Sequence, residues 1–286
     1  MRFLALLCWL LALFAQPALA ATSPQLEPLE RQIGWLLAGK ASDVGLAALD
    51  LKTGDLISIR GDEPFPMAST VKIAVAANYL AQVEHGRRSL DDTISGRPAR
   101  QLMEAMIIHS NNQATDLLLR DLGGPRTLQS WLNQQKITGL RIDRNISQLL
   151  SDKRDLQDVR DSSTPRAMVE LLRRIDSGEL LAPSSKNYLL GLMARCQTGK
   201  NRMRALLPYG TPVEHKTGTL NGLTTDVGFI TLPTGRRLAV AFFARYGTDR
   251  PRTIAEAARA VYDGFANVLR GSFSSYSAPS SSYATR

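Results

Sequence analysis

Apolar positions along the chain follow two different periods, and the change from one to the other outlines the fold. Residues 26–39, LEPLERQIGWLLAG, have apolar residues at helical spacing and end at a glycine, which predicts a helix. Two short apolar runs, 44–51 and 56–60, flank the turn sequence KTGD and predict a β-hairpin. Near the other end of the chain, the predicted elements are strands at 211–218, 224–233 and 236–247 and a helix at 253–271.

The long central part of the chain has a helical period. Its helical segments, punctuated by glycine or proline, are predicted at 70–86, 99–110, 111–123, 125–135 and 164–178. Strands at both ends with a helical insertion between them indicate an α+β fold. One antiparallel sheet of about five strands would be built from 40–60 and 211–246 and covered by the terminal helices. Residues of about 66–207 would form a helical lobe, the whole domain would span 21–270, and a small-molecule site is expected between sheet and lobe.

The two ends of the chain lie outside this domain. Residues 1–20 combine an early arginine, a long apolar run and small residues near the end, the pattern of a secretory signal peptide cleaved after Ala20. A transmembrane anchor is the alternative, but glutamine and proline at 16–17 interrupt the run. Residues 271–286 are rich in serine and are predicted to be disordered. We therefore expect a secreted, periplasmic protein with no integral membrane span after signal removal.

Composition and charge narrow the possible functions. The formal net charge is +9, but the basic residues are dispersed, with no basic stripe interleaved with aromatic residues. This pattern argues against a nucleic-acid partner. Cys8 leaves with the signal peptide, so Cys196 alone remains, no internal disulfide is possible, and a small buried side chain is its expected role. No metal-binding cluster is evident, so we expect no cofactor, and we expect a monomer.

The stretch MASTVKIAVAANYL, residues 67–80, sets Ser69 three positions before Lys72 at the start of an apolar helical run. Ser69 could be a helix N-cap and Lys72 a surface lysine, since serine is favoured at that position. Alternatively, both lie on one helix face, with the hydroxyl as a nucleophile and a desolvated lysine as its base. A helix N-terminus also stabilises the anions that form when a serine attacks. Ser-x-x-Lys alone does not separate these interpretations.

Two further motifs follow in the chain. Residues 110–112, Ser-Asn-Asn, lie at the junction of two predicted helices, where a hydroxyl could relay a proton and an amide could hold a substrate carbonyl. Residues 216–218, Lys-Thr-Gly, lie on a predicted strand and offer a cation, a hydroxyl and a glycine that lets a substrate lie along the strand edge. A second Lys-Thr-Gly at 52–54 lies in the hairpin turn and has an ordinary structural explanation. The ordered set of three motifs is found in class A β-lactamases and penicillin-binding proteins.

From about residue 25 to about residue 270 the chain resembles a class A β-lactamase. Besides the three motifs, the resemblance covers ATDLLLRDLGGP at 114–125, RDSSTP at 160–165 and TGKNRMRALLP at 198–208. It implies a five-stranded antiparallel sheet with an all-helical lobe. It also implies a small-molecule β-lactam or a peptidoglycan stem peptide as the substrate.

The resemblance implies a role for each residue of the motifs. Ser69 would be the acylated nucleophile, and Lys72 would accept its proton. Ser110 would pass a proton toward the leaving nitrogen, and Asn112 would bind the side-chain amide of the substrate.

Further roles concern the rest of the substrate. Lys216 and Thr217 would hold the substrate carboxylate, and Gly218 would let the substrate approach the strand. The backbone N–H groups of Thr219 and of the nucleophile would form the oxyanion hole. Arg237 falls where the family often keeps a carboxylate-binding arginine.

One segment departs from the family. The omega loop of class A β-lactamases reads Arg-x-Glu-x-x-x-Asn, and its glutamate and asparagine hold the water that hydrolyses the acyl-enzyme. Residues 144–150 read RNISQLL, so the glutamate position is Ile146 or, counted back from Asp161, Gln148. No glutamate occurs between positions 104 and 170. The acids of this loop are Asp152, Asp155 and Asp158. One of them could take the role of the missing base, but their spacing is typical of a solvated helix face.

This departure leaves three interpretations of function. Acylation can proceed through Lys72 and Ser110, whereas deacylation loses a general base worth about 10²- to 10⁴-fold in rate. The first interpretation is a serine β-lactamase-family hydrolase that opens β-lactams through an acyl-enzyme on Ser69 and deacylates slowly. The second is a D-alanyl-D-alanine carboxypeptidase or penicillin-binding protein, because some of these resemble class A β-lactamases and lack the glutamate. The third is a non-catalytic binder of β-lactams or peptidoglycan, against which the intact nucleophile argues.

Overall fold

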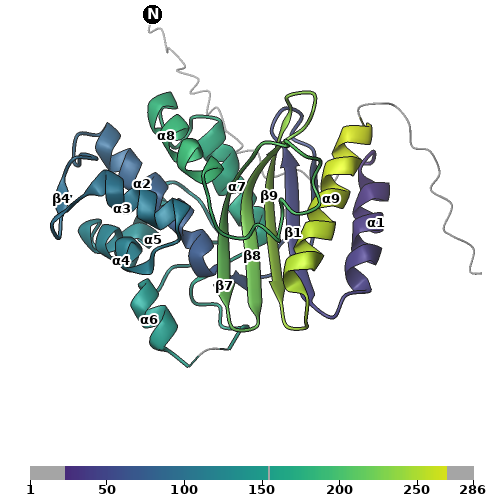
Figure 1. Ribbon diagram of the computed structural model, residues 1–286, viewed down its shortest axis with the longest axis horizontal. Coiled ribbons are helices and arrows are strands. Elements are labelled where there is room, and N and C mark those ends of the chain that lie inside the picture. Colours follow the sequence, from purple (N-terminus) through teal and green to yellow (C-terminus); the bar gives the residue numbers. More distant parts are fainter. Residues whose placement is uncertain (1–22, 154, 269–286) are drawn as a thin grey trace, which may run out of the picture.

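The computed structural model describes residues 23–153 and 155–268 and has an α+β fold (Figure 1). Its main sheet has five antiparallel strands in the order β2-β1-β9-β8-β7. The strands of this sheet are β1 (Asp43–Asp50), β2 (Leu56–Ile59), β7 (Val213–Leu220), β8 (Leu223–Thr231) and β9 (Arg237–Arg245). The predicted fold class and the predicted hairpin are confirmed. The predicted signal peptide and serine-rich tail lie outside the described residues.

The helices fall into two groups according to what they cover. α1 (Glu27–Ala38) and α9 (Arg250–Val268) pack together against the sheet, on the right of Figure 1. The helices of the lobe are α2 (Lys72–Glu84), α3 (Ala99–Ile108), α4 (Asn112–Asp121), α5 (Pro125–Gln134) and α6 (Ile146–Ser151). α7 (Pro165–Asp176) packs directly on β1, β8 and β9, and α8 (Pro183–Ala194) contacts both β7 and the lobe. The predicted lobe of about 66–207 therefore includes a helix that covers the sheet.

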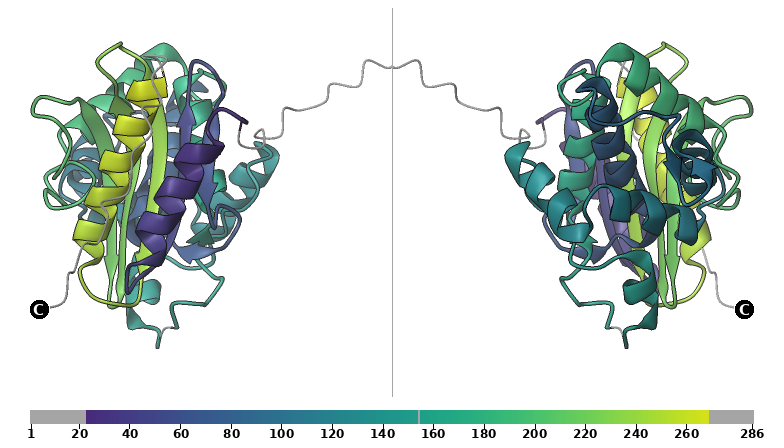
Figure 2. Two further views of the ribbon diagram at one scale, coloured as in Figure 1. Left: turned by 90° about the vertical axis from the view of Figure 1, so that its right-hand side faces the viewer. Right: turned by 90° about the vertical axis from the view of Figure 1, so that its left-hand side faces the viewer.

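Both faces of the sheet are buried, as the near-continuous apolar runs of its strands require. On β1, Leu46 and Ala48 belong to the apolar cluster that includes α1 and α9. Ala47 and Leu49, which alternate with them, belong to the cluster that includes α7 and the lobe helices. Figure 2 shows this layered arrangement from both sides, with α1 and α9 running side by side over one face.

Short elements connect the sheet to the lobe. β3 (Phe65–Pro66) pairs with β6 (Ser162–Ser163), and β4 (Thr93–Ile94) pairs with β5 (Arg97–Pro98). A 3-10 turn, Ala68–Val71, leads into α2 and contacts β7. β7 is an edge strand of the sheet and the strand nearest the lobe in Figure 1. The start of α2, the junction of α3 and α4, and this edge strand therefore meet. Among the described helices, none has both the length and the apolar character that crossing a membrane requires.

Candidate functional site

Ser69 lies in the 3-10 turn Ala68–Val71, which ends directly before α2. Neither the turn nor α2 has a side-chain hydrogen bond at its N-cap, so Ser69 is not a helix cap. The turn is anchored because the Met67 carbonyl accepts the N–H and the hydroxyl of Thr70. Ala68 has a φ of 50°, a left-handed conformation that is strained for a residue with a Cβ atom. Ser69 is partly exposed while both neighbours are buried, so its side chain is the accessible one in the turn.

Lys72 is fully buried, and its ammonium is bonded to the start of α4. It donates to the Ser110 carbonyl over 2.7 Å, to the Ser110 hydroxyl over 3.2 Å and to Asn112 Oδ1 over 2.8 Å. Burial and the neighbouring Lys216 charge lower the pKa of Lys72 to about 7, while Asp116 opposes this shift. A lysine with this pKa is partly neutral near pH 7 and can then accept a proton.

The three residues of the Ser-Asn-Asn motif have different roles: one caps a helix, and the other two bind Lys72. Asn111 caps α4, because its side chain accepts the N–H of Ala114 over 2.8 Å. The residues on both sides of the cap are bonded to Lys72 instead. Ser110 has a φ of 58°, a left-handed conformation of the kind that strained site residues adopt. Asn112 is exposed, and because its Oδ1 accepts from Lys72, its NH₂ group can donate to a ligand.

Lys216 approaches the same hydroxyl from the sheet. Its buried ammonium donates to the Ser110 hydroxyl over 2.9 Å and to the Thr217 carbonyl over 2.8 Å. Burial lowers the pKa of Lys216 to about 8. The Ser110 hydroxyl accepts from both ammonium groups, and a hydroxyl has two lone pairs and one proton. Its proton therefore remains available for donation.

Gly218 lets β7 pack against the turn that carries Ser69. A Cβ atom at this position would lie 2.5 Å from Thr225 Oγ1 and 2.8 Å from the Met67 carbonyl oxygen, closer than real Cβ atoms come. The side chain of Thr217 is buried beside it, with its hydroxyl 2.6 Å from that of Thr198. The sequence predicted the glycine as room for a substrate, and its packing role was missed.

An arginine that the sequence analysis did not single out lies at this end of β7. Arg202 donates to the carbonyls of Gly218 and Thr225 over 2.8 Å each and to the Thr219 hydroxyl over 2.6 Å. Burial lowers the pKa of its guanidinium. Arg202 lies within the TGKNRMRALLP stretch that carries part of the family resemblance, but no pattern in that stretch says which of its basic residues reaches the sheet.

Arg237 lies elsewhere, contrary to the expectation from the sequence. It pairs with Asp176 on α7 and with Glu214 over 3.3 Å. In the register of β8 and β9 it faces Thr231, six residues beyond Thr225, which corresponds to about 20 Å along the strand. The expectation that Arg237 joins the other motif residues is therefore wrong, and Arg202 is the arginine that lies beside them.

Arg144 organises the loop that precedes α7. Its guanidinium is almost fully buried, and three acids pair with it. These partners are Asp161 at 2.6 Å, Asp152 at 2.6 Å and Asp158 at 3.3 Å. Hydrogen bonds from Arg160 lower the pKa of Asp158 to about 2, which makes it a weak base. Asp155 is exposed and accepts the N–H of Gln157 over 3.0 Å. Asp152 and Asp158, which the sequence analysis considered as bases, therefore hold the loop together by pairing with Arg144.

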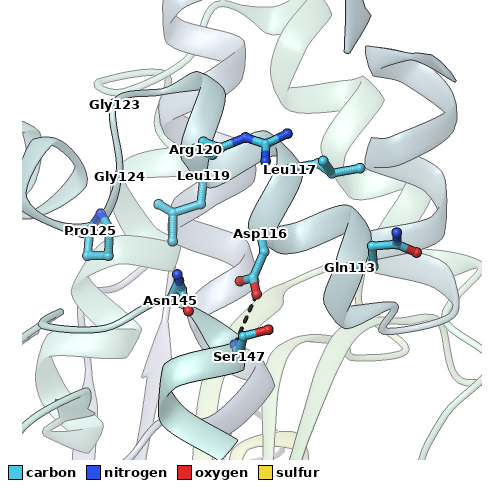
Figure 3. Close-up of a pocket in the computed structure, with 10 residues that line it drawn as sticks. All are labelled: Gln113, Asp116, Leu117, Leu119, Arg120, Gly123, Gly124, Pro125, Asn145 and Ser147. Atoms are coloured by element: carbon cyan, nitrogen blue, oxygen red, sulfur yellow. Dashed lines mark hydrogen bonds between the residues drawn. The ribbon is translucent and has the colours of Figure 1, made fainter. Parts of the chain in front are cut away.

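Asp116 joins α4 to the start of α6. Its carboxylate accepts the N–H of Ile146 over 2.7 Å and the N–H of Ser147 over 2.9 Å, beside a hollow of about 610 Å³ (Figure 3). The Ile146 side chain is buried in the apolar cluster of the lobe. Gln148 is exposed, and its side chain accepts the N–H of Asn145 in a capping box. Neither position considered for the missing glutamate offers a carboxylate.

These contacts place two buried lysines on one hydroxyl and an arginine at the end of an edge strand, and the turn that carries Ser69 packs against that strand. The set suits nucleophilic attack on a substrate that also carries an anionic group. Within the described residues, no three His, Cys, Asp or Glu side chains lie close enough to hold a metal ion. Cys196 is buried and free, with its Sγ 3.3 Å from the Thr198 hydroxyl.

Comparisons with known proteins agree with this geometry. Residues 28–265 match the model of the β-lactamase enzyme family. The extended-spectrum β-lactamase PER-1 of Pseudomonas aeruginosa is 30% identical over 274 residues, which cover 84% of this chain and 88% of that protein. The carbapenem-hydrolyzing β-lactamase KPC of Klebsiella oxytoca is 31% identical over 290 residues, 91% of this chain and 95% of that protein. The structure of an ancestral (GNCA) class A β-lactamase superposes with a TM-score of 0.79 at 34% identity, covering 83% of this chain and 100% of that chain.

Proposed function

Because the chain belongs to the β-lactamase enzyme family, we propose that it is a serine hydrolase that opens β-lactams through an acyl-enzyme on Ser69. The observation that carries this proposal is the pair of buried lysines on either side of the Ser110 hydroxyl. Burial lowers the pKa of Lys72 into the range where it can act as a base, and a surface lysine would show no such shift.

In this proposal, neutral Lys72 takes the proton of Ser69 as the hydroxyl attacks the lactam carbonyl. The Ser69–acyl bond forms, the lactam C–N bond breaks, and the departing nitrogen receives the proton of the Ser110 hydroxyl. Lys72, now an ammonium, passes the proton that it took from Ser69 to Ser110, so that Lys72 and the Ser110 hydroxyl are both restored. Ser110 can give that proton because its lone pairs already face two ammonium groups. The NH₂ group of Asn112 donates to the side-chain amide of the substrate.

The substrate carboxylate is held by cations at the end of β7. Lys216 and Thr217 supply a buried ammonium and a hydroxyl. Arg202 supplies a guanidinium that is held in place by its hydrogen bonds to Gly218 and Thr219. The backbone N–H groups of Thr219 and of the nucleophile form the oxyanion hole.

Deacylation is slow in this proposal. The acyl-enzyme ester needs an activated water, and a general base contributes about 10²- to 10⁴-fold to such a step. Ile146 is buried among apolar side chains, and Asp116 is engaged by two backbone N–H groups. Neither position considered for the missing glutamate, nor Asp116, therefore supplies a free carboxylate to a water beside the ester.

A second candidate function rests on the glutamate that is missing from the omega loop. Without a glutamate between positions 104 and 170, the chain could act as a D-alanyl-D-alanine carboxypeptidase on a peptidoglycan stem peptide and be inhibited by the β-lactams that acylate it. Its expected export to the periplasm as a monomer of residues 21–270 would suit either substrate.

Intact-mass spectrometry after a penicillin pulse tests both candidates. The expected result is the mass of one penicillin added to the protein within seconds and lost over minutes to hours. The second candidate requires, in addition, release of D-alanine from a stem peptide ending in D-alanyl-D-alanine. A protein that opens penicillin without gaining its mass at early times, or that gains no mass and opens none, would contradict the acyl-enzyme proposal.

A further inference from the structure

Behind the motif residues of β7 lies a buried pair that the proposed chemistry does not use. His215 and Asp226 are both fully buried, and His215 Nδ1 lies 2.7 Å from Asp226 Oδ1. A carboxylate only accepts, so Nδ1 carries the proton and donates it to Asp226. Among the described residues, His215 Nε2 has no hydrogen-bond partner. A buried polar pair with an unsatisfied nitrogen costs stability, which calls for a compensating role.

The other oxygen of Asp226 reaches the segment that carries Arg202. Asp226 Oδ2 accepts the N–H of Met203 over 3.2 Å, and Met203 is itself fully buried. Asp226 is the cross-strand partner of Thr217 on β7. One carboxylate thus ties together the strand of the Lys-Thr-Gly motif, β8, and the residue that directly follows the arginine.

The hydrogen bonds of Arg202 depend on where this segment lies. Its guanidinium reaches both Gly218 on β7 and Thr225 on β8, each at 2.8 Å. A planar guanidinium binds several oxygens well only when the aliphatic chain that carries it is held in one position. The segment of 201–207 consists of turns without a helix or strand. Backbone bonds from the Arg202 N–H to Gly199 and from the Ala205 N–H to the Arg202 carbonyl hold the turns together. The bond from the Met203 N–H to Asp226 attaches them to the sheet.

We propose that Asp226, oriented by His215, is a positioning residue for carboxylate recognition: its bond to the Met203 N–H holds Arg202 at the end of β7, where the substrate carboxylate binds. This inference rests on the proposed function, since it concerns how the same site selects substrates with a carboxylate. Asp226 acts through Arg202 and does not touch the substrate.

The test compares a penicillin with its methyl ester, which has the same lactam ring but no anionic carboxylate. The measured quantity is the ratio of their acylation rate constants, kacyl/K, in stopped-flow experiments. Asp226→Ala is expected to lower this ratio by about tenfold or more, with the ester rate changed much less, because only the acid uses Arg202. A general loss of folding would lower both rates equally and leave the ratio unchanged.

A conservative variant and a matched control sharpen the test. In Asp226→Asn, the amide oxygen can accept the Met203 N–H while its NH₂ group donates to His215 Nδ1, so most of the ratio should be retained. Asp50→Ala removes another fully buried carboxylate, one that accepts the Lys52 N–H at the distant β1–β2 turn. It should lower the melting temperature without changing the ratio.

Several outcomes would overturn the inference. One is an unchanged ratio in Asp226→Ala, and another is an equal loss of the ratio in Asp226→Asn. If Asp226→Ala does not fold, His215→Leu, which removes the donor, should lower the ratio, whereas His215→Asn, which keeps an N–H donor, should not. Equal ratios in these two variants would also reject the assignment. A wild-type protein that acylates neither compound would refute the proposed function instead, so the two failures are distinguishable.

Discussion

Lys72 and Lys216 donate hydrogen bonds to the same oxygen, the hydroxyl of Ser110, over 3.2 and 2.9 Å. One lysine comes from the start of the lobe and the other from the edge strand of the sheet, so the site exists only where the two parts of the fold meet. Two buried ammonium groups this close destabilise each other's charged form. The pair therefore favours a state in which Lys72, the lysine with the lower pKa, is neutral and Lys216 is charged.

The pH dependence of acylation should reflect this division. Lys72 accepts a proton only when neutral, so the acylation rate should rise as pH increases through its pKa of about 7. Lys216 binds the substrate carboxylate only when charged, so the rate should fall again as pH rises through about 8. We expect a narrow bell-shaped profile, with rates at pH 5 about 100-fold below the maximum.

Rapid-quench measurement of the penicillin burst from pH 5 to pH 10 would give this profile. Lys216→Arg is the matched variant, because arginine stays charged over this range and should remove the high-pH limb alone. A profile that is flat below pH 7 would show that Lys72 is not the base.

Ser69→Ala should abolish labelling by a fluorescent penicillin while the protein stays folded. The Ser69 side chain caps no helix, so its loss should cost well below the ~1 kcal/mol typical of an N-cap serine. Gel fluorescence and circular dichroism would report the two properties. Ser130→Ala, an exposed serine on α5, should leave labelling unchanged. Labelling that persists in Ser69→Ala would reject Ser69 as the nucleophile.

The sequence predicted the sheet because each strand and turn has a local pattern. The hairpin of 44–60 and the strands of 211–247 needed only alternation and turn residues, and the motif order placed Ser69 and Lys72 near a crevice. The same local rules could not show that α7 packs on the sheet, because helical spacing reveals an apolar face but not its partner.

The arginine was misplaced for a similar reason. Arg237 was chosen because it falls where the family often keeps a carboxylate-binding arginine, but strand register decides which end of a sheet a residue occupies, and register is a property of the assembled sheet. Arg202 comes from a segment of turns, and only the folded chain brings it to β7. The expectation that Lys72 faces Ser69 from one helix also missed its bonds to Ser110 and Asn112, which are distant in sequence.

Asp116 is expected to set both the position of α6 and the charge of Lys72. An asparagine at this position has one acceptor for two N–H groups, and its NH₂ group would face one of the donors. Asp116→Asn should therefore destabilise the protein by about 1–3 kcal/mol. It should also increase hydrogen exchange at the amides of Ile146 and Ser147.

The same substitution should shift the pH profile. The Asp116 charge raises the pKa of Lys72, so its removal should move the low-pH limb of acylation to lower pH. Asp121→Asn is the matched control, because Asp121 lies on the same helix but pairs with Arg88. Equal hydrogen exchange at α6 in both variants would contradict the role of Asp116.

The last prediction concerns the missing carboxylate. The wild-type protein should open about one equivalent of a chromogenic cephalosporin in a burst and then turn over slowly, because in the proposed function no carboxylate replaces the glutamate that is missing from the loop. Asp116 fixes the backbone of Ile146 beside α4, the helix whose first residue is bonded to Lys72. Ile146 also occupies the glutamate position of the family when the loop is counted from Arg144, so it is the first position at which to introduce a carboxylate. Ile146→Glu should speed deacylation by about 10²-fold or more and acylation far less.

Gln148→Glu tests the alternative alignment of the loop. In that alignment, counted back from Asp161, Gln148 and not Ile146 occupies the glutamate position. Gln148 is exposed and its side chain accepts the N–H of Asn145, so a glutamate there would keep that bond and leave deacylation slow. The two variants add the same charge two positions apart, which separates geometry from charge. Faster deacylation in Gln148→Glu than in Ile146→Glu would show that Gln148, and not Ile146, occupies the glutamate position of the family. Rapid wild-type turnover without a burst would mean that a base elsewhere already activates the water. The isoleucine at position 146 would then not slow deacylation.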